Sequence, residues 1–177
     1  LIISDDTTYT GSLTIGAGAQ VIIDTGFEIV IGSGATLTVN GTEDQSVVFA
    51  PINDTWEGLV LEPGSSADID FAMITDFRLA AIRTIDADLS LTGVEIFDSP
   101  AAPPPFSGTR FGVIASLGGR VSIDRCTIGP IDAANGANGG NGSSGNPGGL
   151  GQRGGDGGNV YGLDARGVES FSVTNSR

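Results

Sequence analysis

Residues 13–39 read LTIGAGAQVIIDTGFEIVIGSGATLTV, and this stretch decides the fold class. Apolar residues occur in pairs with one residue between them, and successive pairs start eight residues apart: Leu13/Ile15, Val21/Ile23, Ile29/Ile31 and Leu37/Val39. Alternation with a period of two is typical of β-strands, and the glycines between the pairs indicate turns. An amphipathic helical spacing is not sustained beyond about one turn. The sequence therefore predicts an all-β chain.

A longer repeat of three strand units runs through the later part of the chain. One apolar-polar-apolar unit recurs at residues 69–71, 89–91, 121–123 and 171–173. A second unit precedes it and a third follows it, and the shortest full cycle takes 20 residues, from Ile69 to Leu89. Such a repeat predicts a solenoid, in which each strand pairs with its counterpart one turn further along.

Three short segments carry a resemblance to a known family: residues 35–42 (ATLTVNGT), 56–59 (WEGL) and 121–128 (VSIDRCTI). They resemble the right-handed parallel β-helix repeats of bacterial secreted and cell-surface proteins, and the resemblance covers roughly residues 10–130 and 160–177. It implies a right-handed parallel β-helix of about six rungs and an extracellular or surface location in a bacterium. The repeat is shared by proteins of many functions, so it predicts fold rather than activity.

Two insertions interrupt the repeat within what we interpret as a single domain, residues 1–177. A Pro-rich loop occupies 97–110 and a glycine-rich loop occupies 129–159. Both leave the coil at the same corner of successive rungs, so their roots should lie side by side, about 5 Å apart. We expect the whole chain to be a piece of a longer protein or one subunit of a fibre.

The second insertion has glycine at every third position from Gly136 to Gly157, which makes eight Gly-X-Y triplets. Strict period three predicts a helix of the polyproline II type, as in collagen or polyglycine II. Collagen is disfavoured, because Pro147 alone fills a Y position and a loop rooted at both ends cannot easily trimerise. Two interpretations stay open: a flexible glycine loop, and two packed arms whose outer side carries Asn138, Asn141 and Asn159 as binding candidates.

Composition excludes several classes of function. The 177 residues include 21 Asp and Glu, 8 Arg, no Lys and no His, which gives a net charge of −13. A chain so acidic would repel nucleic acid and anionic membrane surfaces, and it contains no apolar stretch of the ~18 residues that membrane insertion requires. Without His, the commonest general base is missing. We therefore expect no enzyme, no nucleic-acid partner and no membrane insertion.

Polysaccharide cleavage remains the enzymatic alternative, because many pectin-degrading enzymes use this scaffold. It would need clustered carboxylates. The best candidates are Asp68, Asp70 and Asp88, on the expectation that Asp68 lies above Asp88 with Asp70 beside them. We favour a solvated acidic face, since no catalytic signature of those enzymes accompanies the three residues.

Other ligands rest on single features. Asp156, in the run GGDGGN, is a candidate calcium ligand, although one copy of a motif that needs several predicts no cofactor by itself. Phe106 could contact a ligand at the tip of the Pro-rich loop. Ice binding would need a regular threonine array, and Thr14, Thr36 and Thr38 do not recur at matching positions.

The function expected from these observations is an extracellular structural or adhesive β-helix module. Its partners would be a surface glycan or further copies of itself, stacked head to tail or laterally. Carbohydrate binding or degradation is the alternative, and ice binding is a minor one.

Overall fold

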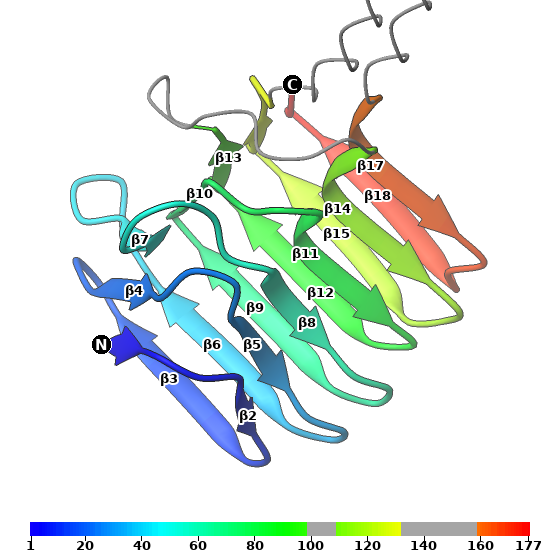
Figure 1. The fold of residues 1–177 in the computed structure, drawn as a ribbon. Coiled ribbons are helices and arrows are strands. Elements are labelled where there is room, and N and C mark those ends of the chain that lie inside the picture. Colours follow the sequence, from blue (N-terminus) through cyan, green and yellow to red (C-terminus); the bar gives the residue numbers. More distant parts are fainter. Residues whose placement is uncertain (99–108, 132–158) are drawn as a thin grey trace, which may run out of the picture.

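The computed structural model describes residues 1–98, 109–131 and 159–177, and every regular element in these ranges is a β-strand. The strands form three parallel six-stranded sheets, here called A, B and C (Figure 1). Sheet A contains β1 (Ile2–Ile3), β4 (Gln20–Ile23), β7 (Val47–Pro51), β10 (Ala72–Thr75), β13 (Glu95–Phe97) and β16 (Thr127–Ile128). Sheet B contains β2 (Thr7–Tyr9), β5 (Glu28–Ile31), β8 (Gly58–Leu61), β11 (Ala80–Ile85), β14 (Arg110–Ser116) and β17 (Val160–Arg166). Sheet C contains β3 (Ser12–Gly16), β6 (Thr36–Asn40), β9 (Ser66–Asp70), β12 (Asp88–Thr92), β15 (Arg120–Asp124) and β18 (Ser170–Thr174).

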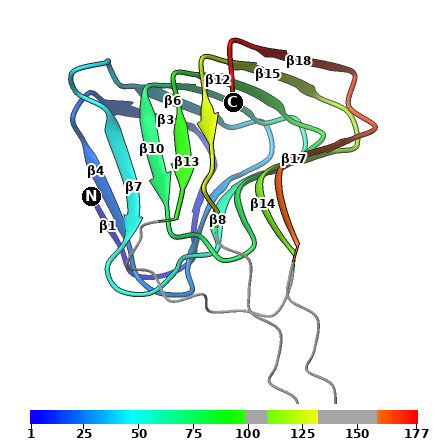
Figure 2. The same cartoon turned by 90° about the horizontal axis from the view of Figure 1, so that it is seen from above.

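The chain visits the sheets in the order A, B, C six times, and each visit pairs with the strand one turn before it. Ser12 pairs with Thr36, so the first turn takes 24 residues (36 − 12), which is three strands at the eight-residue step of the sequence. Seen from above, the sheets form three sides around a common core (Figure 2). The expected all-β parallel β-helix of six rungs is confirmed.

The register corrects one expectation. Leu89 pairs with Ala67 rather than Ile69, and Ile69 pairs with Leu91. The shortest turn is therefore 22 residues (89 − 67) and not 20. A slip of two residues keeps every apolar side chain on the inner face, so alternation alone cannot detect it.

The corner between sheets C and A is what fixes this register. The residue after each of the last four strands of sheet C has a left-handed backbone: φ is 46° at Phe71, 62° at Gly93, 53° at Arg125 and 50° at Asn175. The residues just before them, from Asp70 to Thr174, are partners in one ladder. The one-residue corners therefore lie in line along the coil.

The core is a stack of inward-facing apolar side chains, such as Leu37, Ile69 and Leu91, each at most 1% exposed. Trp56 is also fully buried, stacks against Phe49 and donates a hydrogen bond from Nε1 to the carbonyl oxygen of Thr75 at 2.8 Å. Trp56 thus packs within a rung and offers no platform to a sugar.

The roots of the two insertions lie on neighbouring rungs, as expected. β13 pairs with β16, where the two insertions leave sheet A, and Arg110 pairs with Val160, where they enter sheet B. At the base of the first insertion, the buried guanidinium of Arg110 forms a salt bridge with the buried Asp98 and donates to the carbonyl oxygen of Arg78 at 3.1 Å. The predicted polyproline II-type helix lies outside the described residues.

Candidate functional site

The outward face of sheet C carries mostly short polar side chains, because alternate residues of each strand point away from the core. Three rows run along the coil axis, each with one residue from every strand from β3 to β18. The first row is Ser12, Thr36, Ser66, Asp88, Arg120 and Ser170. The middle row is Thr14, Thr38, Asp68, Ser90, Ser122 and Ser172, and the third row is Gly16, Asn40, Asp70, Thr92, Asp124 and Thr174.

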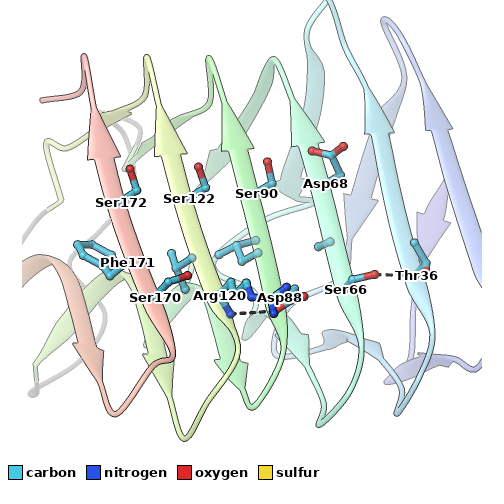
Figure 3. A pocket seen from close by; sticks show the side chains of 13 residues that line it. Thr36, Ser66, Asp68, Asp88, Ser90, Arg120, Ser122, Ser170, Phe171 and Ser172 are labelled. Carbon is cyan, nitrogen blue, oxygen red and sulfur yellow. Dashed lines mark hydrogen bonds between the residues drawn. The ribbon is translucent and has the colours of Figure 1, made fainter.

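The first two rows line a groove of about 460 Å³ on this face (Figure 3). Its lining extends from Thr36 on β6 to Ser170, Phe171 and Ser172 on β18, and so crosses five strands. Four strand spacings of about 4.8 Å make it roughly 19 Å long. The groove is thus an elongated site that follows the coil axis.

Hydrogen bonds order the floor of this groove. The backbone N–H of Arg120 donates to Oδ1 of Asp88 at 2.8 Å, and the hydroxyl of Ser66 donates to Oγ1 of Thr36 at 3.3 Å. The Arg120 guanidinium also lies 3.6 Å from the Glu169 carboxylate, and both side chains are more than 60% exposed. Asp68 projects from the middle row next to Ser90 (Figure 3). The site therefore presents carboxylate and hydroxyl oxygens together with one guanidinium.

The three predicted carboxylates are only partly brought together. Asp68 and Asp88 both line the groove, but Asp68 pairs with Ser90, and Asp88 pairs with Ser66. The expectation that Asp68 lies above Asp88 was therefore wrong, for the same two-residue slip. Asp70 is in the third row, beside the corner at Phe71, and is not part of the groove lining.

The other predicted binding residues are not near this groove or are not described. Asn159 is exposed and precedes β17 of sheet B, where its carbonyl oxygen accepts the backbone N–H of Arg110 at 2.8 Å. Phe106, Asn138, Asn141 and the calcium candidate Asp156 lie outside the described residues.

Carboxylates elsewhere on sheet C are engaged in structural bonds. Asp124 accepts hydrogen bonds from Thr174 at 2.7 Å and from Asn175 at 2.9 Å, and these bonds hold the pKa of Asp124 below its ordinary value of 3.8. Across residues 1–98, 109–131 and 159–177, no three His, Cys, Asp or Glu side chains are grouped so as to hold a metal ion.

The single cysteine is a core residue. Cys126 is 2% exposed, and its sulfur accepts the backbone N–H of Val94 at 3.4 Å. Burial raises the pKa of the Cys126 thiol above its ordinary value of 9.0, so the thiol stays protonated at neutral pH and is a poor nucleophile. This agrees with the small buried side chain expected at this position.

Sequence reasoning missed Arg120 and Ser66 as members of the site. The available signal was the recurrence of Ser or Thr at outward positions, which became visible only with the correct register. Arg120 has no such signal, because it is 32 residues from Asp88 in the chain.

These features define a three-sheet parallel β-solenoid with an elongated polar groove on one side. No family model, no curated protein and no solved structure matches this chain. No membrane-spanning helix occurs in the ranges that the structure describes.

Proposed function

We propose that this chain is an adhesive β-helix module of a secreted or surface protein, and that it binds an extended polysaccharide along sheet C. The observation that carries the proposal is the groove over β6, β9, β12, β15 and β18. Its lining changes residue by residue but keeps one outward hydroxyl or carboxylate per rung in the middle row, as at Asp68, Ser90 and Ser122. A polymer with a short, repeated, polar unit matches such a surface.

The chemistry of the groove suits sugar hydroxyls. Serine hydroxyls both donate and accept hydrogen bonds, carboxylates accept two or more, and a guanidinium donates several. Asp68 and Asp88 outnumber Arg120 among the charged lining residues, and the whole chain carries a charge of −13. The polymer is therefore neutral or carries amino groups, since a polyuronate would be repelled.

Matched variants on one strand test the proposal. Asp68 and Asp70 are both outward on β9, but Asp68 alone lines the groove. We expect Asp68→Asn to raise the Kd for a bound neutral or amino-bearing glycan about tenfold, because a charge-assisted hydrogen bond contributes roughly 1.5–3 kcal/mol. Asp70→Asn should leave the Kd unchanged, and Ser90→Trp should block the groove.

The measurement is affinity electrophoresis against a panel of neutral, amino-bearing and uronate polysaccharides. Equal weakening by Asp68→Asn and Asp70→Asn, or no retention by any polysaccharide of the panel, would contradict the proposal.

Hydrolysis is the second candidate, and the spacing of Asp68 and Asp88 favours it. Being one strand apart and two residues out of register, their Cα atoms lie about 8 Å apart, within the range that separates the two carboxyls of inverting glycosidases. We favour binding, because the Asp88 carboxylate is held by the Arg120 backbone. Release of reducing ends by the natural chain, lost in both Asp68→Asn and Asp88→Asn, would support hydrolysis instead.

A further inference from the structure

The last rung of the coil exposes residues that are buried in every other complete rung of sheet C after the first. Phe171 and Val173 point inward from β18 yet are 43% and 46% exposed. Their ladder partners one rung earlier, Val121 and Ile123, are 2% and 1% exposed. The core is thus open at this end of the molecule.

The open end has a hollow and two free strand edges. A hollow of about 200 Å³ lies between the three sheets, and its apolar lining includes Ile123, Ile128, Leu163 and Val173. β17 and β18 are the outermost strands of sheets B and C, so each is paired on one side within the described chain. Unpaired strand edges beside exposed apolar side chains are a template for another strand.

The first rung of the same protein fits this template. β1, β2 and β3 are the outermost strands at the opposite edge of the same three sheets. Following the ladders rung by rung, Leu13 occupies the position of Phe171, Ile15 that of Val173, and Tyr9 that of Ala165. A second copy stacked on the open end would therefore continue all three sheets and place the large Tyr9 side chain on the small Ala165.

We propose that the open rung β16–β18 binds the first rung β1–β3 of a second copy, head to tail. This inference rests on the ends of the coil and is independent of the glycan proposal. The two ends are different surfaces, since Ile3 and Ile15 of the first rung are 4% and 8% exposed. A contact between unlike ends does not close on itself, so it repeats into a filament.

The test is the mass of the 177-residue chain as a function of concentration, measured by sedimentation and light scattering. The natural chain should grow to several times the monomer mass as its concentration rises. Val173→Lys, which puts a charge on the stacking surface, should stay at the monomer mass. Thr38→Lys adds the same charge on the outward face of β6, away from both ends, and should assemble like the natural chain.

Mixing two blocked variants separates end stacking from misfolding. Tyr9→Lys should also be monomeric alone, but it keeps an intact last rung, and Val173→Lys keeps an intact first rung. Their mixture should form a 1:1 dimer and grow no further. A natural chain that remains monomeric at all concentrations, or a mixture of these variants that does not dimerise, would overturn the proposal.

Discussion

Residues with a left-handed backbone make the sharp corners between sheets C and A. Three of the four in line are not glycine, namely Phe71, Arg125 and Asn175. Asparagine tolerates this conformation well, whereas a left-handed backbone costs other residues roughly 1–2 kcal/mol. Phe71 and Arg125 compensate in part through each other, because the Arg125 guanidinium lies 5.6 Å from the centre of the Phe71 ring.

Gly93 is the corner at which a side chain should be least tolerated. Its φ is 62°, and a Cβ atom there would lie 2.8 Å from the ring carbons of Phe71. We expect Gly93→Ala to lower the free energy of unfolding by at least about 1–2 kcal/mol, measured by urea denaturation. The matched control is Gly16→Ala on the same sheet, where a Cβ meets nothing within 4 Å. Equal stability of the two variants would show that these corners are not constrained.

At the scale of elements, the segment between β13 and β14 is fixed at its base by a buried ion pair. The side chains of Arg110 and Asp98 are each 4% exposed, and Nη2 of Arg110 lies 2.8 Å from Oδ1 of Asp98. The guanidinium also lies 4.9 Å from the centre of the Phe77 ring. Sheets A and B are thus joined at the point where the chain departs from its regular turn.

Removing one partner should be costly, because the other charge stays buried. We expect Arg110→Met to destabilise the fold by about 3–5 kcal/mol. The comparison is Arg78→Met, which removes a pair with Glu57 whose side chains are 49% and 27% exposed and which contributes about 0–1 kcal/mol. If thermal and urea unfolding show the same small loss for both, the buried pair is not what closes this base.

The strands could be predicted from the sequence more completely than their neighbours could. Apolar alternation and the eight-residue step reveal the strands and the six turns, because both follow from the inward side chains. The pairing of Asp68 with Ser90 could not be predicted, since a two-residue slip preserves that alternation. The groove depends on this pairing, and Arg120 enters it from a rung that an insertion separates from Asp88 in the chain.

At the scale of the whole molecule, charge is the dominant imbalance. The chain has 21 acidic residues against 8 arginines, and its exposed ion pairs, such as Arg166 with Asp164, neutralise charge only locally. Like charges on one compact coil repel each other, and salt screens them over a Debye length of about 8 Å at physiological ionic strength.

We therefore expect the Tm to rise between low salt and physiological ionic strength. Differential scanning calorimetry in sodium chloride and in sodium perchlorate checks this, because both salts screen equally at the same ionic strength but differ in their direct effect on the protein. A Tm that falls or stays constant in both salts would mean that repulsion is not a significant term.

The neighbour-only pairing of the rungs has a mechanical consequence. Each strand hydrogen-bonds only to the strands one turn before and after it, so tension applied to one end loads a single rung at a time. The coil should then peel in steps, each releasing the residues of one turn, 22 in the shortest case (89 − 67). Tension across the sides of the coil would load many ladders in parallel, so the molecule should resist shear better than peeling.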